Sequence, residues 1–192
     1  MKISVCSSLL VLLLTITFQL NKAIFPVSKN FIYFERINCR TYDGSKASAV
    51  QCRVKYIDRN HLKAFSSANL TEPVTGLWLR AAAYYKYATY QRISTEIWEN
   101  LCDWIDGKRS SFFMDFLKSH ILQYSNFNHS CPYSGFVFGK ADNVSAQEFA
   151  FPEIMPAGRY RVDINVTEGG RKSLLLGATV YFSVSDHRIE IV

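Results

Sequence analysis

The clearest pattern along the chain is the alternation of apolar and polar side chains over residues 159–167. The apolar phase consists of Tyr160, Val162, Ile164 and Val166. A period of two residues places the two phases on opposite faces of a β-strand, so this segment predicts a half-buried strand. A glycine pair at 169–170 predicts a turn, and the alternating run 174–184 then predicts the second strand of an antiparallel hairpin.

Strand-like patterns recur at about 34–41, 50–57, 76–84, 92–101 and, more briefly, 136–140. Regularly spaced strands favour a β-sandwich or barrel. One segment has helical spacing instead, with apolar side chains three and four residues apart, and Ser110 or Ser111 could cap its start. The sequence therefore predicts one inserted amphipathic helix, whose inward side chains are Phe113, Phe116, Leu117, His120, Ile121 and Tyr124.

The N-terminus has the features of a secretory signal peptide over residues 1–23. A single lysine precedes an apolar stretch that contains the run LLVLLL, and polar residues follow it. A membrane anchor is the alternative, but serines and threonines interrupt the stretch, whereas a spanning helix needs about 20 apolar residues. We therefore expect residues 24–192 to form a single secreted, extracellular domain without a transmembrane segment.

Four cysteines remain after the signal segment, an even set that predicts two disulfides in an oxidising compartment. Four cysteines allow three pairings. A turn signal at Asp43 lies between two strand-like runs, which favours Cys39 opposite Cys52 across a hairpin and leaves Cys102 to pair with Cys131. Zinc is the competing interpretation, but no C-x2-C pair occurs, and no metal site is expected.

Four N-glycosylation sequons support secretion: Asn69, Asn128, Asn143 and Asn165. Asn165 falls on the polar phase of its strand, where a glycan would project. Lys and Arg together number 22 and Asp and Glu 16, a net charge of +6. Two of the lysines belong to the signal segment, and the remaining excess suits solubility or an anionic surface without indicating nucleic acid as a partner.

Catalytic motifs are missing from the sequence. It contains no G-x-S-x-G, H-E-x-x-H or phosphate-binding glycine loop, and the 169–170 glycines are better explained as a hairpin turn. His129 lies near Cys131, but a disulfide would remove the thiolate that a nucleophile requires. His120 is expected to be a core histidine, with a pH-sensitive pocket residue as the alternative. Asp103 and Asp106 are interpreted as solvated surface. We therefore predict no enzyme, catalytic residue or cofactor.

Several short blocks together resemble a large insect family of secreted proteins of unknown function. They are the run NFNHSCPY at 126–133, Cys39, the pair Cys52 and Arg53, Cys102, and the segment PAGRY at 156–160. That family is similar to ML lipid-recognition domains and to the ganglioside activator protein, and some members are expressed in chemosensory tissue. The resemblance implies an immunoglobulin-like, two-sheet sandwich that holds an apolar ligand between its sheets and has no catalytic activity.

The resemblance and the residue patterns lead to the same expectation, a mostly β, ML-like sandwich that carries a lipid or another hydrophobic small molecule. The 28 aromatic side chains (14 Phe, 11 Tyr, 3 Trp) are ample to line a cavity. A secreted interaction module with a filled core, which binds a receptor or another extracellular protein, is the rival function. An esterase-like enzyme ranks third. The expected pocket residues are Trp78, Phe113, Phe116, Leu117 and Tyr160.

Overall fold

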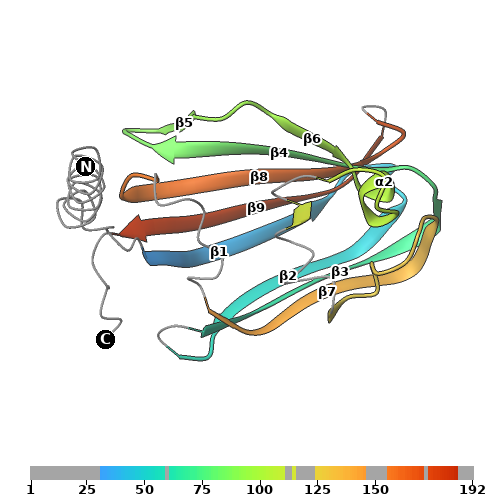
Figure 1. The fold of residues 1–192 in the computed structure, drawn as a ribbon, viewed down its shortest axis with the longest axis horizontal. Coiled ribbons are helices and arrows are strands. Elements are labelled where there is room, and N and C mark those ends of the chain that lie inside the picture. Colours follow the sequence, from blue (N-terminus) through green and yellow to red (C-terminus); the bar gives the residue numbers. More distant parts are fainter. Residues whose placement is uncertain are drawn as a thin grey trace, which may run out of the picture.

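The computed structural model describes residues 31–58, 61–110, 114–115, 124–145, 155–170 and 173–185. Two antiparallel β-sheets lie one above the other, as Figure 1 shows, with a short helix at one end. The chain is therefore mostly β, and the two-sheet sandwich expected from the sequence is confirmed. The predicted signal peptide at 1–23 lies outside the described residues.

The larger sheet has the strand order β1-β9-β8-β4-β5, and a sixth strand, β6, also pairs with β4. The predicted hairpin is confirmed as β8 and β9, which are antiparallel neighbours in the centre of this sheet. The strands of the larger sheet are β1 (Phe31–Thr41), β4 (Leu77–Lys86), β5 (Tyr90–Arg92), β6 (Ile97–Asn100), β8 (Gly158–Glu168) and β9 (Ser173–Ser185).

The side chains expected to point inward from β9 are wrong at the beginning of the strand, where Leu174 was expected inside. Val166 pairs with Leu176 but Thr167 pairs with Leu174, so β9 has one extra residue, a β-bulge, at Leu175. Leu175 is consequently fully buried while Leu174 is 41% exposed.

The smaller sheet has the order β2-β3-β7 and consists of β2 (Ala47–Tyr56), β3 (His61–Val74) and β7 (Tyr133–Ser145). Its central strand β3 has no counterpart among the predicted strands, and β7 extends well beyond the short strand predicted there. Although β1 and β2 follow each other in the chain, they belong to different sheets, so the hairpin expected between them is wrong.

The strand predicted over 92–101 is also corrected, because the chain there forms β5, β6 and then the helix α2 (Leu101–Ile105). Asn100 caps this helix, since its Oδ1 accepts a 3.2 Å hydrogen bond from the backbone N–H of Asp103. Most of the predicted amphipathic helix lies outside the described residues. Met114 and Asp115 within it are helical, and Met114 is buried, whereas Tyr124 is exposed.

Candidate functional site between the two sheets

The inward-facing positions of the larger sheet follow from its contacts with the smaller one. Leu77 of β4 packs in one buried cluster with Ala68 and Leu70 of β3. Alternation along β4 then places Leu79 and Ala81 on the same side, and cross-strand pairing extends that side to β8 and β9. We call these positions, together with those of the smaller sheet that face them, the inner face.

The middle of the inner face is incompletely covered. Val162, Ile164 and Val166 of the central strand β8 are only half-buried, as are Ala178 and Val180 of β9. Thr179, which points to the opposite side of β9, is buried. In a sandwich with a filled core the inward residues would be buried and the outward ones exposed. Here the inward residues in the middle of β8 and β9 are no more buried than their outward neighbours Arg161, Asp163 and Tyr181.

The smaller sheet has the same property. Leu62 and Leu70 are buried, but between them in the same phase of β3 Ala64 is half-buried and Ser66 is exposed. Val54, the cross-strand partner of Ala64, is half-buried too. Thus β-branched apolar side chains of the larger sheet and small side chains of the smaller sheet both face partly accessible space. The sequence analysis missed the part formed by β3, because no strand had been predicted there.

A row of aromatic side chains crosses the larger sheet at one end of this space. Tyr85, Tyr160, Phe182 and Phe34 are successive cross-strand partners on β4, β8, β9 and β1. The ring centroids of Tyr160 and Phe182 are 5.3 Å apart, and those of Tyr85 and Tyr160 are 5.1 Å apart. Tyr160 is 1% exposed, and burial raises the pKa of its hydroxyl, which donates a 2.7 Å hydrogen bond to the carbonyl of Pro156.

One disulfide joins the two sheets along one edge. Cys39 on β1 is bonded to Cys52 on β2, and these strands are edge strands of different sheets. The predicted pairing is therefore confirmed, but it connects sheets and does not cross a hairpin. The hydroxyl oxygen of Tyr56 accepts a 2.7 Å hydrogen bond from the backbone N–H of Phe34 and adds a second link along this edge. Burial raises the pKa of Tyr56.

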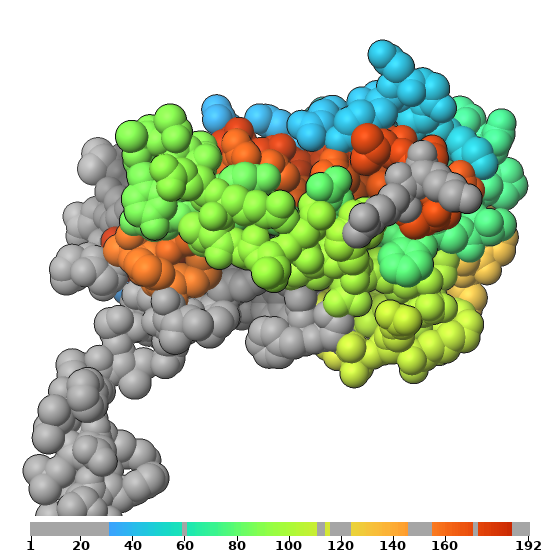
Figure 2. Space-filling model, turned by 90° about the horizontal axis from the view of Figure 1, so that it is seen from above, coloured from blue at the N-terminus to red at the C-terminus, as the bar shows by residue number. Residues whose placement is uncertain are grey.

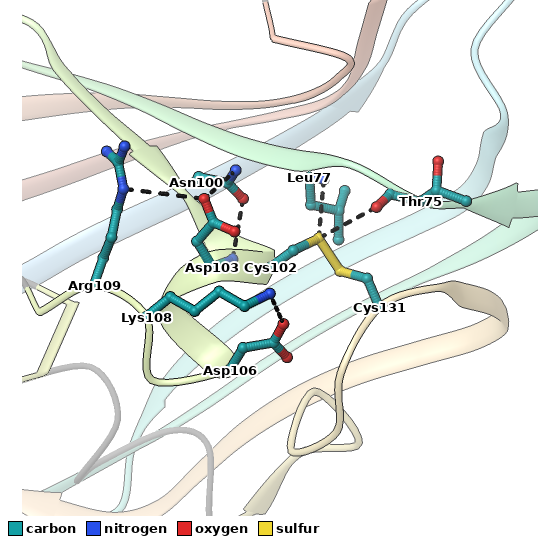
Figure 3. Close-up of polar contacts among 9 residues, drawn as sticks. All are labelled: Thr75, Leu77, Asn100, Cys102, Asp103, Asp106, Lys108, Arg109 and Cys131. Atoms are coloured by element: carbon teal, nitrogen blue, oxygen red, sulfur yellow. Dashed lines mark hydrogen bonds and ion pairs between the residues drawn. A yellow bond between two sulfur atoms is a disulfide. The ribbon is translucent and has the colours of Figure 1, made fainter.

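The second disulfide joins the sheets along the opposite edge. Cys102 in α2 follows β6 of the larger sheet, and Cys131 precedes β7, the edge strand of the smaller sheet (Figure 3). The sulfur of Cys102 accepts a 3.3 Å hydrogen bond from the backbone N–H of Leu77. This confirms the second predicted pairing. The two sheets are covalently tied between β1 and β2 and again at the end of the sandwich that carries α2 (Figure 1).

Tyr133 supports this second edge from inside the core. Its side chain is 1% exposed, and its single hydroxyl hydrogen is shared between the backbone carbonyls of Phe127 and His129. Burial, with a smaller contribution from the charge of Asp106, raises its pKa to about 12.

The residues expected to form the pocket are only partly brought together. Tyr160 is on the inner face, within the aromatic row. Trp78 occupies the opposite phase of β4 from Leu77 and Leu79, so it faces away from the smaller sheet, and the expectation is corrected at this residue. Phe113, Phe116 and Leu117, like His120, lie outside the described residues.

Three of the four sequon asparagines, Asn69, Asn128 and Asn143, are exposed. Asn165 is half-buried, and its side-chain oxygen accepts a 2.6 Å hydrogen bond from the hydroxyl of Tyr42. Asn69 and Asn143 lie on β3 and β7, so two of the three exposed sequons are on the smaller sheet.

The polar groups singled out in the sequence have structural partners. Cys131 is disulfide-bonded, so it has no thiol to act as a nucleophile beside His129. The carboxylate of Asp103 accepts a 2.9 Å hydrogen bond from the side-chain amide of Asn100 (Figure 3). The carboxylate of Asp106 lies 2.8 Å from the ammonium of Lys108, which holds the pKa of Asp106 below its usual range. Across the described ranges no cluster of three metal-ligating side chains occurs. Nor does any helix in these ranges have the length and apolar character needed to cross a bilayer.

Together these features define a disulfide-tied β-sandwich whose inner face is partly open. Residues 79–162 match the sequence model of a protein family of unknown function, DUF1091. The matched segment runs from β4 to the first half of β8 and contains the Cys102–Cys131 disulfide. No curated protein matches the chain.

Proposed function

We propose that the protein is a secreted, non-enzymatic carrier that binds a lipid or another hydrophobic small molecule between its two sheets. The observation that carries this proposal is the exposure of the middle of the inner face. Val162, Ile164 and Val180 remain accessible where a filled sandwich would bury them. Exposed apolar surface of this kind is a net cost unless a ligand covers it.

The chemistry of the inner face indicates the class of ligand. Among the described inner positions there is no Lys or Arg. The carboxylates in this phase are Glu99 on β6 and Glu168 at the end of β8, and Glu168 is paired with Lys46. The remaining polar groups are uncharged, such as the Ser66 hydroxyl. Burying a charged head group without a partner costs several kcal/mol or more, so the site suits an acyl chain or an uncharged apolar molecule.

Secretion is part of the proposal and rests on the signal-like N-terminus, the sequons and the two disulfides, which persist in oxidising compartments. The resemblance to secreted insect proteins similar to ML domains adds chemosensation as the setting, in which the carrier presents its ligand to an extracellular receptor. The rival function, an interaction module with a filled core, is disfavoured by the accessible inner face.

The experiment that tests the carrier function is native mass spectrometry of protein secreted from insect cells, before and after organic extraction. A bound mass that extraction removes, with saturable uptake of a fluorescent fatty acid by the extracted protein, is the expected result. Val180→Trp should fill part of the inner face and weaken uptake at least tenfold. Leu174→Trp, a matched control on the exposed side of β9, should leave it unchanged. An extracted protein that takes up no probe would contradict the proposal.

A further inference from the structure

The outward side of the larger sheet has an unusual surface for a solvated β-sheet, because aromatic rings and cationic side chains lie on one another across its strands. The guanidinium of Arg161 lies 4.0 Å from the ring centre of Tyr84, and that of Arg36 lies 4.1 Å from Tyr181. We call this surface the arginine–aromatic face; its members are Arg36, Arg40, Tyr42, Arg80, Tyr84, Lys86, Tyr90, Arg92, Trp98, Arg161 and Tyr181.

Six of these residues, Arg36, Tyr84, Lys86, Tyr90, Arg161 and Tyr181, form a connected network. Tyr90 lies 5.8 Å from Tyr181 between ring centres, and it also has the cations of Arg161 and Lys86 over its ring. Figure 2 shows the molecule from above, where β4 to β6 (green) and β9 (red) contribute adjacent parts of the near surface. The face spans five strands from β1 to β5, which corresponds to a width of about 20 Å at ~4.8 Å per strand.

The face carries an excess of positive charge. Its acidic groups are Glu96, which is paired with Arg80 and Arg92, and Asp163, which lies 3.0 Å from Arg161. At its margin Glu35 is paired with Arg159, 3.4 Å away. Arg36, Arg40 and Lys86 are exposed, and no ion pair is recorded for them among the described residues. Their charges are therefore available to an incoming anion.

The outward side of the smaller sheet has a different composition of cationic side chains. Its cations are mainly lysines, Lys55, Lys63 and Lys140, and it carries the exposed sequon asparagines Asn69 and Asn143. Arginine, tyrosine and tryptophan are enriched at protein interfaces and their hot spots, whereas lysine is depleted. The arginine–aromatic face has five arginines and one lysine, so its composition is typical of an interface. The smaller sheet also carries outward aromatic rings, Phe136 and Phe138, but its cations are mainly lysines, and among the described residues no cation lies over those rings.

We propose that the arginine–aromatic face binds an acidic polypeptide segment, one whose Asp and Glu carboxylates meet the exposed guanidiniums. A guanidinium pairs with a carboxylate in a planar, two-bond geometry, and stacking on a ring holds it in place before binding. A polypeptide fits better than a membrane, because the rings of this face lie half-buried beneath cations and do not project as apolar anchors. The proposal is independent of any ligand between the sheets.

The test measures binding of a fluorescent peptide of twelve glutamates to the secreted, full chain by anisotropy at low salt. The double variant Arg36→Glu, Lys86→Glu should weaken binding at least tenfold. The control Lys55→Glu, Lys63→Glu changes two exposed cations of the smaller sheet and lowers the net charge equally, so it should weaken binding less than threefold. Arg36→Lys keeps the charge but loses the planar pairing and should fall between the parent and the double variant.

Three results would overturn the proposal. The first is no binding of the peptide by the parent protein. The second is equal weakening by both double variants, which would indicate diffuse attraction by net charge. The third is binding of heparin oligosaccharides or phosphatidylserine vesicles without binding of the peptide. If the double variant fails to fold by circular dichroism, Arg36→Gln alone, at an exposed position, should still weaken peptide binding at least threefold, and unchanged binding would refute the role of this face.

Discussion

Two inward-facing alanines provide the sharpest test of an open inner face. Ala81 on β4 pairs with Ile164 on β8, which in turn pairs with Ala178 on β9. Both alanines thus lie in one cross-strand row, with the same side chain and the same orientation. Ala81 is 3% exposed and packs with Trp104, whereas Ala178 is half-buried. Replacing each by phenylalanine should therefore give very different results.

At Ala81 the added ring has no room. Overpacking of a filled core costs about 1–3 kcal/mol, and a change this large belongs at the upper end. For a chain of this size about 3 kcal/mol lowers Tm by about 6–12 °C. At Ala178 the ring enters accessible space, and the burial of its own surface offsets the local rearrangement. We expect the free energy of unfolding of Ala178→Phe to change by less than about 1 kcal/mol.

The assay is urea unfolding followed by tryptophan fluorescence, on protein freed of ligand by organic extraction. Extraction matters because a ligand that binds only the folded state adds to its apparent stability. The same samples should show that Ala178→Phe weakens uptake of a fluorescent fatty acid, since the ring occupies the space that the probe would use. Equal destabilisation by both substitutions would show that the row is packed throughout, and the reasoning from exposure would be refuted.

Three further predictions concern the disulfides, Tyr133 and the glycans. Replacing both cysteines of a disulfide by serine should lower the free energy of unfolding by about 3 kcal/mol for Cys39 and Cys52 and by about 3.5 kcal/mol for Cys102 and Cys131. The second loss is larger because that disulfide closes the longer loop, and urea unfolding of the two variants would show which is less stable. Tyr133→Phe should be less stable than the parent at pH 8, but this deficit should shrink between pH 10 and 12 in unfolding experiments, because the raised pKa makes the parent lose stability as the unfolded chain ionises first. A glycosidase specific for N-linked glycans should lower the apparent mass of the secreted protein, and glutamine at each of the three exposed sequon asparagines, Asn69, Asn128 and Asn143, should remove part of that shift in electrophoresis.

The fold was predictable where one side of a strand is polar and the other is strongly apolar. The β8–β9 hairpin satisfies this condition, and its boundaries and pairing agree with the alternation in the sequence except at the β-bulge at Leu175. The cysteine pairing was also predictable, although for an incorrect reason. An even set of cysteines and a turn signal suggested a hairpin, but only the three-dimensional structure shows that β1 and β2 enter different sheets at the turn between them.

Trp78 was misplaced because a large aromatic side chain is expected to be inside a small domain. Here the outward phase of β4 also carries Tyr84, whose ring is covered by the guanidinium of Arg161. Cations from neighbouring strands shield aromatic rings on this side, so rings need not point inward to escape water. A pattern within one strand cannot reveal this arrangement, because the shielding cations come from other strands.

The strand β3 was not predicted because its sequence lacks a strong alternation of apolar and polar side chains. Its inward phase contains Ala64, Ser66 and Ala68, and large apolar side chains are confined to its ends at Leu62 and Leu70. A strand that packs against a filled core needs bulky inward residues to exclude water, and this need produces the usual alternation. A strand that lines a ligand space needs small ones, which leave room for the ligand. The proposed carrier function would therefore account for both the weak pattern of β3 and the exposure of its middle.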